Sequence, residues 1–413
     1  MRPVLFLSGR DPLESAGGHG TYVRAHALAA LGAGYEPHIF SVSWRGGRLP
    51  TDFGVLHRIA TPFRPVRQLM IVGHAPVLRR GAERFVREEG WRKVLIHGFG
   101  SFSSVGVDLA HRLRLRGVEA VAIASSYGFH ETEVRAMVAG VRPAHGLWQW
   151  LRHRAEYALV GATVARYERR AYRESRLVLV NYESVRASIE RAAGRLPEIR
   201  LVPYTSEAAF RHSDCPGCVA GPGCGTVAGL ASERPLVLAV SRHDARKGVD
   251  VLLQALAQLR DSGTRTRARL IGGGPLLDAH RRLAARLGLD EVEIPGFVAD
   301  PHSHLHEADV FVLPSLQEGS GSVSLIEALQ VGLPIIASAC DGIPEDVIDG
   351  LDAVLVPPGD AAALAAAMRR ILADEPLRRR LSASARACFG RRFAPDRLVD
   401  TLGGIYRELG FPP

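Results

Sequence analysis

The sequence lacks any long apolar segment. No run of about 18 or more uncharged apolar residues occurs in the chain, which excludes a hydrophobic transmembrane helix. The first residues, MRPVLFLSGRDPLESAGG, hold a short apolar core that meets charges at Arg10 and Asp11. This pattern is typical of a first β-strand rather than of a signal peptide. We therefore expect a cytoplasmic protein without membrane association.

The sequence also lacks basic runs interleaved with aromatic residues, so we expect no nucleic-acid partner. The net charge is nevertheless +9, from 52 Lys+Arg against 43 Asp+Glu, and most of the cations are arginine. This excess favours an anionic ligand or surface, although a general enrichment in arginine and alanine explains the charge equally well. Basic helical stretches such as 74–87 carry arginine on several faces, which favours solvated surfaces over lipid contact.

Cysteine is scarce, and an odd count of five without a secretion signal argues against a disulfide framework. Three cysteines lie in the segment HSDCPGCVAGPGC, where a Pro-Gly turn separates two of them, as in half of a zinc site. A histidine in the same segment offers a fourth ligand. The candidate metal ligands are His212, Cys215, Cys218 and Cys224. A structural zinc site, a Gly/Pro-rich loop of free thiols and a redox pair all stay open as explanations.

Apolar strands alternate with helical segments through most of the chain, and 413 residues are too many for one compact core. This alternation predicts parallel sheets covered by helices. We therefore expect an α/β protein with two Rossmann-like domains that face a cleft, where ligands of open parallel sheets bind. The expected parts are a first domain over 1–205, a Cys/Gly/Pro-rich linker or insert over 206–233, a second domain over 234–392 with its last helix over 360–376, and an amphipathic C-terminal helix over 393–413.

A glycine-rich loop, SAGGHGTYV, lies between the first strand and the first helix. Backbone amides of Gly17 and Gly18, together with the helix N-terminus, suit an anion. The loop lacks the glycine spacing of a dinucleotide-binding fingerprint and the lysine of a nucleotide-hydrolase loop. Taken alone, it is explained equally well as a tight strand-to-helix turn.

The stretch SRHDARKGVDVLLQAL places Arg242 and Lys247 between a strand and a helix. Two cations at the end of a parallel strand, beside a helix N-terminus, are well placed to hold a pyrophosphate. As isolated charges in a loop they need no ligand, and that simpler explanation weakens only if further motifs agree.

The stretch LPSLQEGSGSVSLIEAL supplies such a motif. Gly319 and Gly321 permit close approach of the backbone to a ligand before a helix that starts near Val323. Glu318 precedes the turn and Glu327 lies about one helical turn inside the helix. Carboxylates accept hydrogen bonds from vicinal hydroxyls, so the two glutamates suit two sugars on either side of a phosphate bridge. A glutamate favoured by the helix dipole explains either one alone, but not both together.

In this order, the motifs resemble the nucleotide-sugar domain of the retaining glycosyltransferases of family 4, which have the GT-B fold. The matching pieces span about residues 235–375 and include LIGGGPLLDAHRRLAARLGL, VEIPGFV and DGIPEDVIDGLDAVLVPPGD. The family usually has seven residues between its two glutamates, whereas eight separate Glu318 from Glu327, so the turn holds one extra residue within SGS. The family also often has an acidic residue where this chain has Gly273.

The resemblance implies a retaining, metal-independent, hexosyltransferase-type enzyme with a nucleotide-diphosphate sugar as co-substrate and no catalytic cofactor. It assigns Arg242 and Lys247 to the diphosphate, Glu327 to the ribose and Glu318 to the donor hexose. It implies that the C-terminal helix packs back on the first domain. The implied catalytic residues are His130 (in YGFHETE), Arg242, Lys247 and Glu318. The implied donor-binding residues are Gly17, Gly18, Arg242, Lys247, Phe297, Val298, Glu318, Gly319, Gly321, Ser322, Val323 and Glu327.

The resemblance also assigns the acceptor to the first domain. We expect a small molecule or natural-product intermediate as acceptor, with a lipid as the alternative. Two rival functions stay open: a nucleotide-sugar epimerase of the same fold, which would convert the donor without an acceptor, and a non-catalytic sugar-nucleotide-binding protein, which would never turn the donor over. Nothing in the sequence indicates the oligomeric state.

Overall fold

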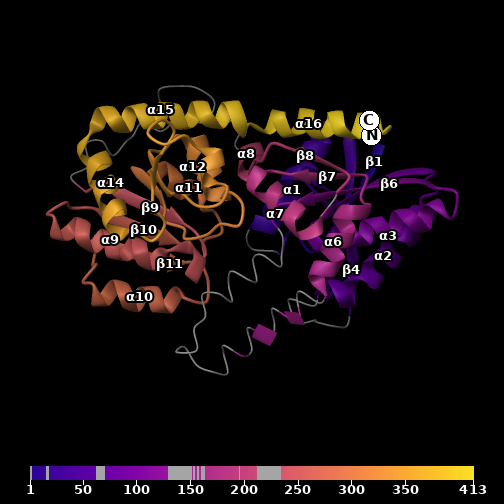
Figure 1. The fold of residues 1–413 in the computed structure, drawn as a ribbon, viewed down its shortest axis with the longest axis horizontal. Helices are drawn as coiled ribbons and strands as arrows, with labels where there is room; N and C mark the ends of the chain where they lie inside the picture. The colour runs from indigo at the N-terminus through magenta and orange to yellow at the C-terminus, as the bar shows by residue number, and fades with distance from the viewer. Residues whose placement is uncertain are drawn as a thin grey trace. The chain divides into compact units, whose positions relative to one another are not determined.

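The computed structural model describes residues 2–14, 18–61, 70–128, 163–194, 196–211 and 234–413, together with residues 151, 154, 155, 158 and 159. The chain forms two compact units. Unit 1 is Met1–Glu207 with Pro395–Pro413, and unit 2 is Ala208–Ala394. Each unit is built on one largely or wholly parallel sheet with helices packed on it (Figure 1). The α/β class predicted from the alternation of strands and helices is therefore confirmed.

The sheet of unit 1 has the order β3-β4-β2-β1-β5-β6-β7-β8. All neighbouring strands are parallel except β3 and β4, which pair antiparallel. The strands are β1 Arg2–Arg10, β2 Tyr35–Ser43, β3 Gly47–Thr51, β4 Gly54–Ala60, β5 Lys93–Phe99, β6 Glu119–Ser126, β7 Leu177–Val180 and β8 Glu198–Leu201. The chain moves outward from β1 in one direction and then resumes at β5 on its other side, so the strand order reverses between β1 and β5.

Helices lie between most of the parallel neighbouring strands along the chain, as parallel pairing requires. The described helices of unit 1 are α1 Gly18–Gly32, α2 Met70–Glu88, η2 Gly100–Phe102, α3 Ser103–Arg114, α6 Val164–Glu174 and α7 Glu183–Ala193, while α8 Glu207–Arg211 lies mostly in unit 2. Helix α6 precedes β7 in the chain. Its buried face includes Ala165, Glu168 and Tyr172, which recur at the spacing of one helix face.

The C-terminal helix α16, Pro395–Glu408, belongs to unit 1 and packs against α1. Two buried tyrosines fix this end of the chain. Tyr406 Oη lies 2.8 Å from His97 Nδ1, and Tyr35 Oη donates to the carbonyl oxygen of Phe411 over 2.6 Å. Val399 fits against Gly32, where an added Cβ would lie 3.1 Å from its side chain. The helix is thus a component of the unit 1 core rather than a loose tail.

The sheet of unit 2 is fully parallel, with the order β11-β10-β9-β12-β13-β14. Its strands are β9 Leu236–Val240, β10 Arg267–Ile271, β11 Val292–Gly296, β12 Val310–Leu313, β13 Ile335–Ser338 and β14 Val354–Val356. The chain moves outward from β9 to β11 and then resumes at β12 on the other side of β9. The order therefore reverses between β9 and β12, and the loops after these two strands lie at the carboxyl edge, where open parallel sheets bind ligands.

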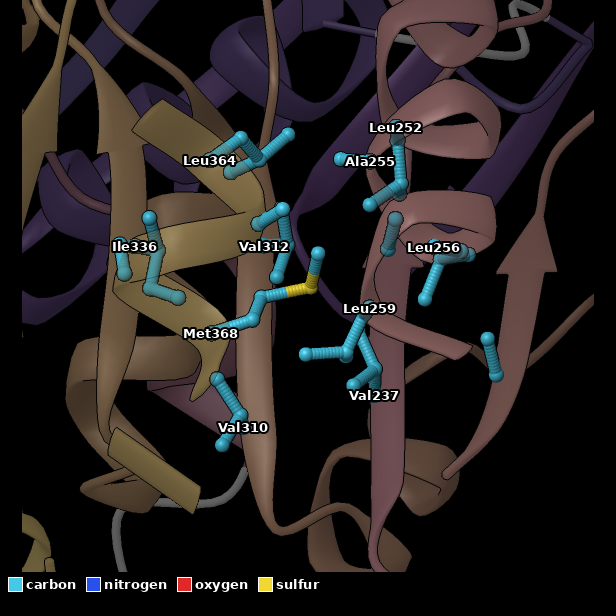
Figure 2. Packing of buried hydrophobic residues seen from close by; sticks show 14 of the residues in the cluster. Val237, Leu252, Ala255, Leu256, Leu259, Val310, Val312, Ile336, Leu364 and Met368 are labelled. Carbon is cyan, nitrogen blue, oxygen red and sulfur yellow. The ribbon is translucent and has the colours of Figure 1, made fainter. Parts of the chain in front are cut away.

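Apolar helix faces build the unit 2 core on this sheet. In α9, Val249–Asp261, the buried side chains of Leu252, Ala255, Leu256 and Leu259 follow the i, i+3, i+4, i+7 spacing. Figure 2 shows them facing β-strand side chains such as Val237, with Met368 from α14 among them. Burial of each leucine stabilises the unit by roughly 1.5–3 kcal/mol. The remaining helices in the described part of unit 2, from Arg234 onward, are η4 Ala245–Lys247, α10 Leu277–Arg286, α11 His302–Glu307, α12 Val323–Val331, α13 Ile343–Asp346, α14 Ala361–Ala373 and α15 Glu375–Arg392.

The end of unit 2 differs from the expectation of one last helix over 360–376. Helix α14 stops at Ala373, and a separate helix, α15, starts at Glu375. Asp374 ends the first helix, and its side chain accepts a hydrogen bond from the amide of Leu377, which caps the second. Pro376 lies in the first turn of α15, where its missing N–H costs nothing. The sequence therefore encodes a new helix start at the point where we expected an end.

Candidate functional site

Two loops at the carboxyl edge of the unit 2 sheet are tied together through their backbones. The loop after β9 carries η4, and its Arg246 carbonyl oxygen accepts hydrogen bonds from the amides of Leu316 and Gln317 in the loop after β12 (2.7 and 3.0 Å). Gly248 has φ +58, and a Cβ there would lie 2.1 Å from the Pro314 carbonyl oxygen. Only glycine permits this approach. The two loops flanking the reversal of strand order thus form one rigid assembly.

Lys247 and Glu318 meet at the centre of this assembly. Lys247 Nζ donates to Glu318 Oε2 over 2.5 Å, and Ser315 Oγ donates to Glu318 Oε1 over 2.5 Å. The side chains of the lysine and the glutamate are 16% and 4% exposed. The chain contains only one other lysine, Lys93, among 52 Lys+Arg. A compact ammonium group, rather than a guanidinium group, therefore faces this nearly buried carboxylate.

The backbone around Glu318 is held from the loop after β13. Asp341 Oδ2 accepts hydrogen bonds from the amides of Glu318 (2.6 Å) and Gly319 (2.7 Å). Beneath them, Cys340 Sγ lies 3.4 Å from the Ser315 carbonyl oxygen. Burial, together with the charges of Glu318 and Asp341, raises the pKa of the Cys340 thiol to about 12, so this thiol is neutral and unreactive.

The turn after Glu318 leads into α12 as expected. Ser322 is the N-cap residue with extended backbone, but its hydroxyl lies 3.0 Å from Ser324 Oγ and makes no capping bond to the helix. The first amides of α12, from Val323 onward, thus have no side-chain cap and suit an anion. Glu327 lies one turn further along α12 and is half-buried. Gly321, in the turn itself, is also half-buried.

The remaining predicted donor-binding residues lie on neighbouring loops of the same edge. Arg242 is exposed and immediately precedes the buried His243. The His243 amide donates to the Gly273 carbonyl oxygen over 3.0 Å, and its ring nitrogen Nδ1 lies 2.9 Å from Nδ1 of His280. These bonds fix the base of the loop that carries the two cations.

Phe297 and Val298 follow β11. Phe297 is 70% exposed, and its Cβ lies 3.6 Å from the position that a Cβ on Gly273 would take. An exposed aromatic ring offers a face on which a flat ligand such as a base can stack. Val298 is half-buried next to it.

In unit 1, the sequence analysis did not single out a histidine beside the glycine-rich loop. Gly18 starts α1, and the next residue, His19, contacts strand β1 and the residue that follows β6. Its Nδ1 lies 2.8 Å from Tyr127 Oη, and its Nε2 lies 3.2 Å from the Ser8 carbonyl oxygen. Because that carbonyl only accepts, Nε2 carries the proton and Nδ1 accepts from the tyrosine. Burial and the charge of Arg10 lower the pKa of His19 to about 4, which keeps the ring neutral.

Other predicted site residues lie outside the described residues: Gly17, His130, His212, Cys215, Cys218 and Cys224. Their assignments stay predictions. Among the described residues, no group of three or more His, Cys, Asp or Glu side chains is arranged to hold a metal ion. Within the described ranges, no helix combines the length and apolar character that a membrane span needs.

His97, at the end of β5, is a core residue. It is fully buried between Ser125 Oγ (2.6 Å) and Tyr406 Oη (2.8 Å), and it stacks on Phe99. Burial, followed by the proximity of His26, lowers its pKa well below the usual value. Its two nitrogens are both occupied within unit 1, which assigns it to holding α16 in place.

The buried neutral histidines predict acid sensitivity. Burial lowers the pKa of His19 and His26 to about 4, and it lowers the pKa of His97 well below 6.5. In the unfolded chain each histidine has the ordinary pKa of 6.5. Below pH 6.5 these histidines are protonated in the unfolded state, whereas in the folded state they stay neutral. The free energy of unfolding should therefore fall as pH drops from 6.5 towards 4, by up to about 1.4 kcal/mol per pH unit for each histidine. Urea titrations at pH 7.5, 6.5 and 5.5 measure this, and a midpoint that stays constant would contradict it.

Comparisons with known proteins relate the chain to glycosyltransferases. Residues 227–387 match the family model described as glycosyl transferases group 1. The α-D-kanosaminyltransferase of Streptomyces kanamyceticus is 31% identical over 248 residues, which cover 59% of this chain and 63% of the relative. The GDP-mannose-dependent α-(1-6)-phosphatidylinositol monomannoside mannosyltransferase of Mycolicibacterium smegmatis is 36% identical over 190 residues, which cover 42% of this chain and 48% of the relative. The chain thus matches less than two thirds of the length of either relative.

The solved structure of sucrose-phosphate synthase from Thermosynechococcus elongatus has a TM-score of 0.75, with 24% identity over 99% of both chains. This similarity shows the fold, which is GT-B. The sequence matches are thus to glycosyltransferases over part of the chain, and the structural match shows the GT-B fold.

Proposed function

We propose that the protein is a retaining glycosyltransferase of family 4 that moves a sugar from a nucleotide-diphosphate sugar to an acceptor hydroxyl. The observation that carries the proposal is the Lys247–Glu318 pair at the reversal of strand order in unit 2. Ligands of open parallel sheets bind at this point. The pair joins a group suited to phosphate with a group suited to sugar hydroxyls, which is what a sugar diphosphate presents.

The proposed roles follow from position. Lys247 and Arg242, on the loop after β9, bind the diphosphate, together with the uncapped amides at the start of α12. Glu318 binds the donor sugar and Glu327 the ribose hydroxyls. Phe297 and Val298 border the base. The role of His130 near the transferred sugar rests on the family resemblance alone.

The proposed reaction needs a leaving group rather than an enzymic nucleophile. The bond between C1 of the sugar and the diphosphate oxygen breaks, and negative charge develops on the diphosphate. Cations and helix-start amides stabilise that charge, so we propose that the reaction needs no metal ion. The acceptor hydroxyl attacks C1 from the leaving-group face through an oxocarbenium-like transition state, and its proton passes to the departing phosphate. The configuration at C1 is retained.

The acceptor is proposed to be a small molecule. The name of the Streptomyces relative describes transfer of a kanosaminyl group, whereas that of the Mycolicibacterium relative describes a lipid acceptor. A lipid is therefore the alternative. An epimerase would convert the donor alone, and a non-catalytic protein would bind the donor and leave it intact.

The test is a thermal-shift panel of UDP, GDP, ADP and dTDP, each in the presence of EDTA. A nucleotide at 100 times its Kd stabilises the folded state by about 2.7 kcal/mol, which raises Tm by several degrees. We expect one nucleotide to give this shift, and we expect Arg242→Ala and Glu327→Ala to abolish it. Arg286→Ala, an exposed arginine on α10, is the matched control and should keep the shift. Absence of a shift with every nucleotide would overturn the proposal.

Incubation with the sugar forms of that nucleotide separates the rival functions. Release of free nucleotide that is stimulated by an added acceptor identifies a transferase. Conversion of the donor to an isomer without nucleotide release identifies an epimerase, and an unchanged donor identifies a binding protein.

A further inference from the structure

Asp341 has an unusual backbone conformation for a residue other than glycine. Its φ is +47, and no other non-glycine residue in the described part of the chain has a positive φ. The left-handed region is unfavourable for a residue with a Cβ, although aspartate tolerates it better than most. Such strain persists where the surrounding structure enforces it, and it concentrates at functional sites.

Three hydrogen bonds between the two loops hold Asp341 in this backbone conformation. The Asp341 carboxylate bridges from the loop after β13 to the loop after β12, where Oδ2 accepts from the amides of Glu318 and Gly319 over 2.6 and 2.7 Å. The next residue reinforces the bridge, because the Gly342 amide donates to the Ser320 carbonyl oxygen over 3.0 Å. A charged acceptor on two adjacent amides is among the stronger hydrogen-bond arrangements in proteins.

This bridge determines where the Glu318 side chain points. The turn after Glu318 starts with Gly319 at φ +82 and holds one residue more than the family usually has, so its own sequence allows several conformations. The carboxylate of Asp341 accepts hydrogen bonds from the two amides at the start of the turn, and this selects one conformation of the turn. The Glu318 carboxylate is then held between Lys247 and Ser315.

The bridge also changes which amides are free for a ligand. The Gly319 amide, which we expected to approach the donor, donates to Asp341 in this structure. The first amides of α12 have no side-chain cap. An anionic group of the donor can therefore bind the first amides of α12, Arg242 and Lys247. The turn at Glu318 is then left to bind the sugar.

We propose that Asp341 is a positioning residue that governs recognition of the donor sugar, and not of the nucleotide, by orienting Glu318. This inference rests on the proposed function. Asp341 contacts the backbone of Glu318 and Gly319, and no hydrogen bond of the described residues links its side chain to Arg242 or Lys247. Its removal should consequently affect the sugar half of the donor selectively.

Three substitutions separate the carboxylate from the backbone conformation. Asp341→Gly keeps the positive φ and removes the carboxylate. Asp341→Asn keeps an acceptor oxygen and tolerates the same φ. Asp341→Ala removes the carboxylate and also strains the backbone. Urea unfolding of each variant shows whether the fold is intact before any ligand is added.

The binding experiment uses the nucleotide identified by the panel and its glucose and mannose forms, measured by calorimetry. For Asp341→Gly we expect nucleotide Kd to stay within about twofold, while affinity for the preferred nucleotide sugar falls about tenfold or more. Asp341→Asn should restore most of that loss. Equal loss for nucleotide and nucleotide sugar, or no loss for either, would overturn the proposal.

Amide hydrogen exchange tests the positioning without any ligand. We expect Asp341→Gly to speed exchange at Glu318 and Gly319 by about tenfold, with exchange in α9 unchanged and near-normal protection in Asp341→Asn. Unchanged protection at these two amides would overturn the positioning role even if nucleotides bind. If the native protein binds no nucleotide, the proposed function fails and the sugar-recognition role fails with it, while the exchange result still decides the positioning.

Discussion

Replacement of Lys247 by arginine is expected to lower the rate of nucleotide release from the donor at least about 100-fold, although the charge is kept. Lys247 reaches Glu318 over 2.5 Å, and the next residue, Gly248, is fixed by its close backbone approach to Pro314. The planar guanidinium group of arginine is larger than an ammonium group and bonds carboxylates in a forked geometry. It must displace the Glu318 side chain, and misplacement of a site group by about 1 Å is enough for a loss of this size.

The matched control is the other lysine of the chain. Lys93 pairs with Glu119 over 2.6 Å, but the two side chains are 32% and 60% exposed, so solvent can accommodate a different cation. Lys93→Arg should therefore leave both activity and Tm nearly unchanged. Donor turnover, nucleotide affinity and Tm are measured for both variants. Activity of Lys247→Arg within a few-fold of the native protein would show that the site requires only positive charge, and would contradict the proposed geometry.

Removal of the charge has a second consequence for Lys247. Lys247→Met leaves the 4% exposed Glu318 carboxylate without its cation. Loss of one partner of a buried pair costs about 3–5 kcal/mol, so this variant should lose stability as well as activity. For that reason the arginine variant, which keeps a cation, is the informative test of function.

The sequence predicts the architecture well because parallel strands reveal themselves as short apolar runs between helices. Helix α15 was not predicted in this way. Its buried positions include Leu377, Leu381, Ala385 and Cys388, but arginine, serine and alanine fill much of the rest, so its apolar face is narrow. The signal that identifies its start is Asp374 followed two residues later by Pro376, an N-cap residue and a first-turn proline.

The candidate site is foreseeable only in part. Lys247 and Glu318 each follow a strand, so both are expected at the carboxyl edge, but their direct bond depends on β12 lying next to β9. That neighbour relation is a property of the strand order. Asp341 and His19 are harder to foresee, since an exposed aspartate in a turn and one histidine in a glycine-rich loop carry no pattern. Their importance arises from a positive φ and from partners distant in the sequence.

Two adjacent glycines give the second large prediction, because they differ in what a methyl group would meet. Gly272 has φ +143, and a Cβ there would lie 1.9 Å from the Ser241 carbonyl oxygen, at the start of the loop that carries Arg242 and Lys247. Neither the strand ends nor the backbone carbonyl can move away without breaking the bonds between β9 and β10. Backbone strain and overpacking together predict that Gly272→Ala lowers the free energy of unfolding by about 3 kcal/mol or more.

Gly273→Ala is the matched control. Its added methyl group would lie 3.6 Å from Phe297 Cβ, an ordinary contact, and its φ is not positive. We expect a change within about 0.5 kcal/mol in urea unfolding and an unchanged nucleotide thermal shift. Gly272→Ala should reduce that shift even at a temperature where it is folded, because the Ser241 end of the cation-bearing loop is displaced. Equal stability and equal nucleotide binding of the two variants would mean that the loop adjusts freely, and the rigid assembly on which the Lys247–Glu318 geometry depends would then not exist.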